Sequence, residues 1–270
     1  MSKRILPIIV IYRCQLDEAI AYQTLIQAAA VTEFVVYDNS PSDYNQEEGR
    51  IPQGAHYFHD TDNGGLSKAY NYGVEVAERL GYEWVLLLDQ DTQFPTGAYA
   101  HYCEGMAHQM LIVPNVVLKS GQPFSPCRPQ WKGMLPLNLP TGEYSLKAYN
   151  VINSGCCLPV DLFKRAGGYK EDVRLDFSDY QFQRRLRKVS DRFYVLPMTV
   201  MQDFSNDEID LKKLQNRFLL YLEGAACCEC DGVGDRLCLL LAVLKHSVAL
   251  SLRTHSSYFI VSFLRKYLIH

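Results

Sequence analysis

The sequence predicts an α/β fold with a mostly parallel sheet flanked by helices, followed by a helical C-terminal extension. Apolar runs of strand type alternate with segments of helical spacing through residue 206, a pattern typical of βαβ units around a parallel sheet. From residue 207 to residue 270 this alternation stops and the chain reads as helical. We therefore expect two parts, residues 1–206 and residues 207–270.

The opening of the chain alternates strand and helix. Residues 5–12 are a continuous apolar run, and residues 17–30 carry apolar side chains at helical spacing. Gly81 stands where the C-terminus of a helix favours glycine. In this first part we expect strands at residues 5–12, 33–37, 56–59 and 84–89, and helices at residues 17–30 and 66–80.

The predicted strand at residues 84–89 ends in two carboxylates, Asp89 and Asp91, one residue apart. Ligands of parallel α/β sheets collect at the carboxyl ends of the strands, so acidic side chains there are placed to meet a cation. Oxygen ligands suit Mg²⁺ or Mn²⁺, which commonly bind through one or two carboxylates together with substrate phosphates. The alternative is a simple turn, because Asp is a common turn residue.

Two glycines, Gly64 and Gly65, precede the predicted helix at residues 66–80. Because they lack side chains, a ligand or a neighbouring backbone can approach closely there. They can also serve only to permit positive backbone angles before the helix. The residues alone leave both interpretations open.

The second part of the sheet domain begins with a long irregular segment. Residues 119–150 are rich in Pro and Gly and show little periodicity, which is more typical of a functional loop than of a scaffold element. Gly167 and Gly168 mark the end of a short helix. Here we expect strands at residues 151–159 and 193–200, and helices at residues 162–166 and 176–189.

The composition bears on partners and compartment. A net charge of −3 gives no overall basic field of the kind that nucleic-acid-binding proteins have. Nine cysteines without a secretory signal before them favour a reducing cytosol. Cys227, Cys228 and Cys230 cluster, but a structural zinc site needs a second ligand pair, and Cys238 stands alone.

The C-terminal segment is basic. Residues 236–270 contain five Arg or Lys and no Asp or Glu. Residues 237–252 are strongly apolar, but Lys245 and His246 at their centre argue against a helix that crosses a bilayer. Such a segment can lie on an anionic membrane surface or pack on the sheet domain, and both can hold at once.

Five motifs stand in order along the chain. They are Val35-Val36-Tyr37-Asp38-Asn39-Ser40, Asn63-Gly64-Gly65-Leu66 with Ala69-Tyr70-Asn71-Tyr72-Gly73, Leu86-Leu87-Leu88-Asp89-Gln90-Asp91-Thr92, Asn153-Ser154-Gly155, and Gly167-Gly168-Tyr169 leading to Leu175-Asp176-Phe177-Ser178-Asp179. Each motif alone is weak, but their order and spacing give the chain a resemblance to the family 2 glycosyltransferases, and especially to their rhamnosyltransferase-like branch. The resemblance covers roughly residues 5 to 205.

The resemblance implies a GT-A fold, a nucleotide-sugar donor of dTDP or UDP type, and a divalent metal, Mg²⁺ or Mn²⁺. By position, Asp38 matches the contact to the nucleotide base, Asp89 the contact to the donor ribose or sugar, and Asp91 the metal ligand. Asp179 matches the general base. The further donor-binding residues expected by position are Tyr12, Asn63, Gly64, Gly65, Lys68, Asn71 and Arg185.

The chain departs from the family pattern in two places. Gln202 stands where many relatives carry a His that completes the metal shell, so Gln202, Asp203 or water would take that place. Arg13 follows Tyr12 where an Asn is usual.

Asp176 rivals Asp179 as the general base, because residues three apart share one face of a first helical turn. Asp176 can equally be the N-cap of that helix.

The residue types suit glycosyl transfer. An acceptor hydroxyl is a poor nucleophile, and a carboxylate within hydrogen-bond reach can remove its proton. A metal bridging the phosphates stabilises the leaving diphosphate. We therefore expect an inverting, metal-dependent transferase that moves a sugar to a glycan or lipid-linked glycan in surface polysaccharide synthesis. The resemblance implies L-rhamnose as the sugar and dTDP-rhamnose as its donor. We expect it in the cytoplasm, peripheral at the inner face of the cell membrane through residues 236–270.

Two alternatives remain. A phosphatase of the haloacid dehalogenase type also places D-x-D after an apolar strand, but it needs Thr or Val four residues after the first Asp, where this chain has Gln93. A glycosyltransferase-like domain that binds a nucleotide without turnover is the other, and the missing His motivates it.

Overall fold

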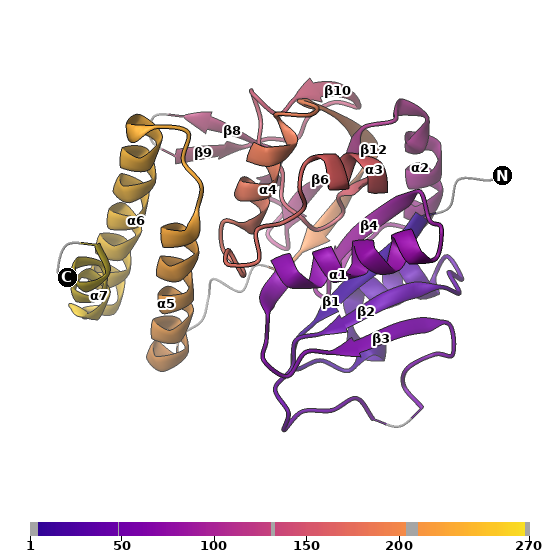
Figure 1. The fold of residues 1–270 in the computed structure, drawn as a ribbon, viewed down its shortest axis with the longest axis horizontal. Coiled ribbons are helices and arrows are strands. Elements are labelled where there is room, and N and C mark those ends of the chain that lie inside the picture. Colours follow the sequence, from indigo (N-terminus) through magenta and orange to yellow (C-terminus); the bar gives the residue numbers. More distant parts are fainter. Residues whose placement is uncertain (1–4, 48, 131–132, 204–209, 268–270) are drawn as a thin grey trace.

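The computed structural model describes residues 5–47, 49–130, 133–203 and 210–267. A mixed sheet with helices on both faces forms the larger part, and three helices form a separate layer at its side (Figure 1). The strand order is β10-β12-β6-β11-β4-β1-β2-β3, with β5 paired to β12 and β7 paired to β6. The predicted mostly parallel sheet flanked by helices, with a helical C-terminal extension, is confirmed.

The parallel half of the sheet brings the ends of its strands to one edge. Pairs β4–β1, β1–β2 and β2–β3 are all parallel, and Val10 is in register with Asp89 while Ile11 is in register with Asp38. The turns after these strands therefore lie side by side. The strands are β1 (Ile5–Ile11), β2 (Phe34–Asp38), β3 (Ala55–His59) and β4 (Trp84–Asp89).

Helix α1 (Gly65–Arg79) crosses one face of this half (Figure 1). Its buried face enters a core with Leu6, Ile8 and Leu87. A side chain at Gly73 would stand 2.6 Å from Ile8, so the glycine allows helix and strand to pack closely. The helix begins and ends one residue earlier than the sequence predicts.

The predicted helix at residues 17–30 is not one regular helix. A short 3₁₀ turn at Leu16–Glu18 and a π-helix at Tyr22–Gln27 replace it. The backbone N–H of Ala21 donates to the Gln90 carbonyl at 3.2 Å and so leaves the helical ladder. The contact ties this segment to the turn after β4.

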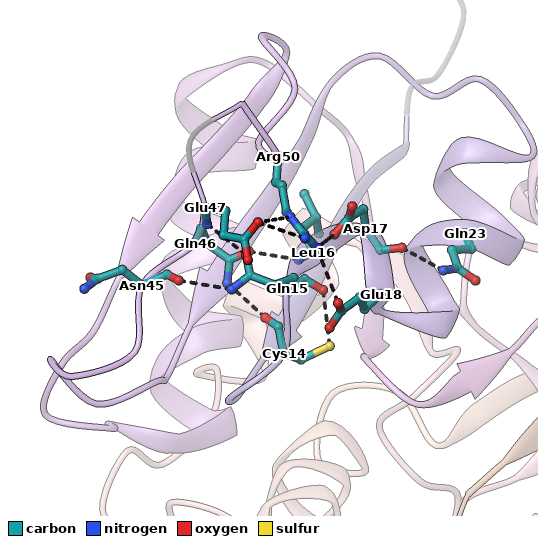
Figure 2. A network of polar contacts seen from close by, with 10 residues as sticks. All are labelled: Cys14, Gln15, Leu16, Asp17, Glu18, Gln23, Asn45, Gln46, Glu47 and Arg50. Atoms are coloured by element: carbon teal, nitrogen blue, oxygen red, sulfur yellow. Dashed lines mark hydrogen bonds and ion pairs between the residues drawn. The ribbon is translucent and has the colours of Figure 1, made fainter.

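Polar contacts fasten the segment after β1 to the loop after β2 (Figure 2). The Gln46 side chain accepts from the Leu16 N–H at 2.8 Å and donates to the Cys14 carbonyl at 2.9 Å. Arg50 pairs with Asp17 at 2.9 Å. These bonds stabilise the loops at the edge where the strands end.

The second half of the sheet departs most from prediction. Residues 151–156 are irregular instead of strand, because Gly155 has a φ of +81° and only β11 (Cys157–Pro159) joins the sheet, antiparallel to β4 and β6. The predicted loop at residues 119–150 contains short strands. The elements here are α2 (Ala98–Gly105), β5 (Thr92–Gln93), β6 (Leu111–Leu118), β7 (Pro123–Ser125), β8 (Cys127–Gln130), β9 (Gly133–Pro136), β10 (Gly142–Ser145), α3 (Val160–Arg165), α4 (Ser178–Leu186) and β12 (Arg192–Gln202).

The extension has an apolar core of its own, built around Phe218, Val243 and Phe259. Its helices are α5 (Leu211–Cys227), α6 (Val233–Thr254) and α7 (Tyr258–Tyr267). The predicted boundary between residues 206 and 207 lies outside the described residues, as do residues 207–209 and 268–270.

Ion pairs join the extension to α4. The Arg184 side chain, only 8% exposed, lies 2.5 Å from the carboxylates of both Asp231 and Asp235. Beside it, Arg185 pairs with Glu229 at 2.6 Å. We call these five residues the α4 cluster. Charge-assisted pairs of this length are strong, so the cluster fixes the extension against α4.

Candidate functional site

Asp89 is held by three elements at the end of β4. Its Oδ1 accepts from the Tyr70 hydroxyl of α1 at 2.6 Å, and its Oδ2 accepts from Gln202 Nε2 of β12 at 3.4 Å. Its backbone N–H donates to Ser154 Oγ at 3.1 Å. Burial raises the pKa of Asp89, and the Tyr70 and Gln202 bonds oppose that rise. Helix, strand and loop thus meet on one carboxylate.

Asp91 lies beside it in an environment that disfavours its charge. Burial raises the pKa of Asp91 to about 7, the charge of Asp89 adds to the rise, and a hydrogen bond from Gln202 opposes it. Two neighbouring carboxylates in a desolvated place need a positive charge to remain ionised together.

Gln202 reaches this place because β5 pairs with the end of β12, with Gln202 in register with Thr92. Its Oε1 is buried and has no hydrogen-bond partner among the described residues. Such an oxygen is expected to have a partner, and here a cation beside Asp91 would provide one.

These residues fit Mg²⁺ or Mn²⁺. Asp91 and Gln202 offer hard oxygen ligands, and such ions commonly take only one or two carboxylates plus phosphates. Asp203 is 2.5 Å from Lys119, so its charge is already paired. Within the described ranges, no group of three or more His, Cys, Asp or Glu side chains is arranged to hold a metal.

Asp179 stands in the first turn of α4. Its Oδ1 accepts from the Tyr180 N–H at 2.7 Å, and no hydrogen bond to its other carboxylate oxygen is found among the described residues. Burial raises its pKa to about 6, the Tyr180 bond opposes this, and the charges of Asp176 and Asp89 add to it. A carboxylate with this pKa is suited to general-base work near neutral pH.

Asp176 does not share the first helical turn, so that expectation is wrong. The residue before α4 is Phe177, whose left-handed φ of 69° turns the chain, and no side chain caps the helix. The Asp176 carboxylate instead accepts from Arg217 Nε at 3.1 Å and Nη2 at 3.0 Å. It binds the extension.

A buried chain of hydrogen bonds supports the start of α4. The Tyr169 hydroxyl donates to Asn153 Oδ1 at 2.7 Å, and Asn153 Nδ2 donates to Ser178 Oγ at 3.0 Å. The ring of Tyr169 lies 5.4 Å from that of Tyr70. No role was predicted for Tyr70, Ser154 and Tyr169, although each lies inside one of the five motifs. Their spacing to Asp89 and Asp179 depends on the fold.

Two expected donor contacts lie at the strand ends. Tyr12 is 46% exposed, and its N–H donates to Gln90 Oε1, in the middle of the D-x-D, at 2.7 Å. Asp38 is fully buried, and its carboxylate accepts from the Ser40 N–H at 2.9 Å and the Tyr57 hydroxyl at 2.9 Å. Asp38 therefore organises the end of β2.

The glycine turn before α1 is closed by backbone. Gly65 has a φ of +86°, and a Cβ there would lie 2.3 Å from the Arg174 carbonyl oxygen. Gly65 shows features of both interpretations, because a neighbouring backbone comes close to it and its φ is positive. Asn63 also has a positive φ, and the Gly64 N–H donates to Asp60 Oδ2 at 3.1 Å.

Three other expected donor contacts are engaged within the chain. Lys68 Nζ donates to Asp60 Oδ2 at 2.9 Å. The Asn71 side chain accepts from the Tyr169 N–H at 2.9 Å and donates to the Tyr169 carbonyl at 3.0 Å. Arg185 donates to Glu229 and, at 3.2 Å each, to two carbonyls of the glycine pair after α3. Among the described residues, no hydrogen bond links Lys68, Asn71 or Arg185 to the D-x-D.

The fold is similar to solved structures of sugar-transferring enzymes. It matches GalNAc-T7 with UDP, GalNAc and Mn²⁺ at a TM-score of 0.54 and 12% identity, over 74% of this chain and 44% of that chain. It matches S. aureus TarS 1-349 in complex with UDP at a TM-score of 0.56 and 14% identity, over 98% of this chain and 81% of that chain. Both are GT-A-type glycosyltransferases. This chain has a GT-A fold.

The GT-A match extends to TarS 1-349 in complex with UDP-GlcNAc, at a TM-score of 0.54 and 14% identity over 97% of this chain and 81% of that one. The chain spans less than half of the GalNAc-T7 chain. No protein-family model and no curated protein sequence matches it.

Proposed function

We propose that the chain is an inverting glycosyltransferase that uses a nucleoside-diphosphate sugar and a divalent metal. The observation that carries the proposal is the cluster of Asp89, Asp91 and Gln202 at the carboxyl edge of a GT-A sheet, with the buried Gln202 Oε1 lacking a partner among the described residues. The solved GT-A neighbours with UDP, UDP-GlcNAc or Mn²⁺ support the same class of ligand.

Each residue takes one role in the proposed reaction. Asp179 accepts the proton of the acceptor hydroxyl while the acceptor oxygen forms a bond to the anomeric carbon. The bond from that carbon to the phosphate oxygen breaks, so attack from the opposite face inverts the anomeric configuration. Mg²⁺ or Mn²⁺ bound to Asp91, Gln202 and the phosphates would act as a Lewis acid on the departing diphosphate. Asp89 contacts the ribose or sugar of the donor.

The donor base lies beside the end of β2, where Asp38 holds Ser40 and Tyr57 in place. Tyr12 is exposed next to the D-x-D and contacts the donor. Lys68, Asn71 and Arg185 act as positioning residues, because their polar groups already bind the chain. The resemblance to the rhamnosyltransferase-like branch favours dTDP-rhamnose as donor, and a glycan or lipid-linked glycan as acceptor.

A thermal-shift screen of nucleotide sugars with and without Mn²⁺ tests the donor. A ligand that binds the folded state raises apparent stability, so dTDP-rhamnose should raise Tm more than UDP-GlcNAc, and only with metal. Gln202→Ala should weaken the metal-dependent part. Nucleotide binding without donor hydrolysis or transfer would support the non-catalytic alternative, and no nucleotide binding at all would reject both.

Release of phosphate from simple phosphoesters would revive the phosphatase alternative, which the GT-A fold does not support. The anomeric configuration of the product, read by NMR, tests inversion. Retention would contradict the role given to Asp179.

A further inference from the structure

The outer side of α6 carries an exposed apolar stripe. Leu237 is 54%, Leu241 55% and Leu252 72% exposed, and Val248 lies between them. Their spacing of four, seven and four residues keeps them on one side of an α-helix. By length and composition, α6 is also the helix within the described residues that could cross a membrane, with 22% of its most apolar window buried. We call these four residues the α6 stripe.

The other side of α6 is already packed. Val243 and Ser247 are fully buried, and Leu250 is nearly so, against the helices of the extension. The ring of His246 lies 4.7 Å from that of Tyr221 on α5. The helix therefore has a protein-facing side and a separate apolar side that no described residue covers.

Exposed cations stand near the ends of the helices of the extension. Arg236 and Arg253 stand at the two ends of α6, and Arg265 and Lys266 lie in the last turn of α7. None of the four forms an ion pair with an acidic side chain in the described part of the chain. Residues 236–270 contain no Asp or Glu, so the part of α6 that follows Asp235, together with α7, carries basic side chains and no acidic ones.

This combination selects among possible partners. In a symmetric dimer through the stripe, each copy would place these cations against the same cations of the other copy, and like charges repel. A helix crossing the bilayer would lose the packing of Val243 and carry Lys245 into the hydrocarbon. An anionic lipid surface satisfies both features, because it accepts apolar side chains at its boundary and attracts Arg and Lys.

We propose that the α6 stripe and the cations near the ends of α6 and α7 bind the surface of an anionic membrane, with α6 lying in the plane of the interface. The binding does not depend on the sugar-transfer reaction. The α4 cluster then links the lipid-bound extension to the helix that carries Asp179. Resting on the proposed function, this link would hold the acceptor side of the site in a constant relation to the membrane and favour a lipid-linked acceptor.

Co-sedimentation of the full chain with vesicles tests the lipid binding. Vesicles of equal parts phosphatidylcholine and phosphatidylglycerol should bind the protein at low salt, and pure phosphatidylcholine vesicles should bind it weakly. The double variant Leu241→Gln/Leu252→Gln should reduce binding about tenfold or more, because it removes apolar area from the stripe. Arg236→Gln/Arg253→Gln should reduce it about twentyfold, with the remaining binding less sensitive to salt.

Matched controls keep the outcomes distinct. Met134→Gln changes another exposed apolar residue and Arg79→Gln another exposed cation, and both should bind vesicles like the unchanged protein. Circular dichroism confirms that each variant is folded. Equal binding to neutral vesicles, or no effect of the stripe variants, would overturn the proposal. A stripe-dependent dimer without lipid binding, or resistance to alkaline extraction, would replace it with self-association or a spanning helix.

Discussion

The Tyr70 hydroxyl donates a 2.6 Å hydrogen bond to Oδ1 of Asp89, joining α1 to the end of β4. Burial raises the pKa of both groups, so the phenol keeps its proton and the bond orients the carboxylate. Because the bond fixes one oxygen, the orientation of the Asp89 carboxylate depends on α1.

Tyr70→Phe should therefore weaken donor binding about tenfold without unfolding the protein, because one charge-assisted hydrogen bond is lost inside the site. Tyr72→Phe on the same helix is the matched control, since the Tyr72 ring packs on Phe58. Calorimetric titration with a nucleotide sugar and Mn²⁺ measures the difference. Equal affinities for the two variants would contradict the role given to the bond.

Asp91→Asn should lower kcat/KM at least about a hundredfold and remove its dependence on Mn²⁺, because the variant loses a charged metal ligand. Asp161→Asn, which removes an exposed carboxylate from α3, should leave turnover unchanged. Donor hydrolysis measured across Mn²⁺ concentrations separates the two. Unchanged, metal-dependent turnover in Asp91→Asn would contradict the assignment of Asp91 as a metal ligand.

The pH dependence of turnover should report Asp179. A general base acts only when deprotonated, so kcat/KM should rise with pH through an apparent pKa of about 6. Asp179→Asn should lose this limb together with about a hundredfold or more of the activity. A steady-state pH profile of both proteins checks it. A limb that survives in the variant would assign the titration to another group.

The ionised form of Asp179, which should favour turnover, should lower the free energy of unfolding. Burial raises the folded pKa of Asp179 above its ordinary 3.8, so the folded state binds more protons than the unfolded state between those values. The ionised residue therefore costs stability above pH 6, and this cost disappears as pH falls toward 4. Asp179→Asn should be more stable than the unchanged protein at pH 7.5, by about 1 to 3 kcal/mol, and no more stable at pH 4.

Gly65→Ala and Gly81→Ala form a matched pair for the turn before α1. Both glycines have positive φ, but only Gly65 would place a Cβ against backbone, 2.3 Å from the Arg174 oxygen. Gly81→Ala should cost about 1 to 2 kcal/mol from the backbone angle alone. Gly65→Ala should cost about 2 kcal/mol more and displace the Arg174 segment. Urea unfolding of both variants measures the difference, and equal losses would refute the contact.

Arg184→Met should destabilise the protein by about 3 kcal/mol, because it leaves two carboxylates without their buried partner. Asp235→Asn should cost more than Asp231→Asn, since the Asp235 side chain is 31% exposed and that of Asp231 is 67% exposed. Denaturant unfolding of the three variants gives the order. The reverse order of the two Asp variants would contradict the geometry.

Local pattern predicted the parallel half of the sheet well. The strands β1, β2 and β4 are short apolar runs followed by polar segments, and the D-x-D begins at the last residue of β4 as expected. The same local signal failed for residues 151–156, which were predicted as strand but form an irregular segment in which Gly155 has a φ of +81°. It also failed for β6 (Leu111–Leu118), where no strand was predicted. The antiparallel insertion of β11 between β4 and β6 depends on strands that are far away in the chain.

The candidate site was predictable in part for the same reason. Strand ends locate Asp89 and Asp91, whereas the bonds of Arg185 to Glu229 and of Asp176 to Arg217 join residues more than forty positions apart. Helical spacing places Asp176 and Asp179 on one face, but the left-handed Phe177 breaks that register. Sequence spacing cannot supply such contacts.

The α4 cluster also bears on modularity. A chain cut at residue 206 would keep Arg184 and Arg185 but lose every acid that neutralises them, and Asp176 would lose Arg217. The GT-A core and its extension are therefore not separable building blocks. Moving the extension to another protein of this fold would require transferring the acids at 229, 231 and 235 together with the two arginines of α4.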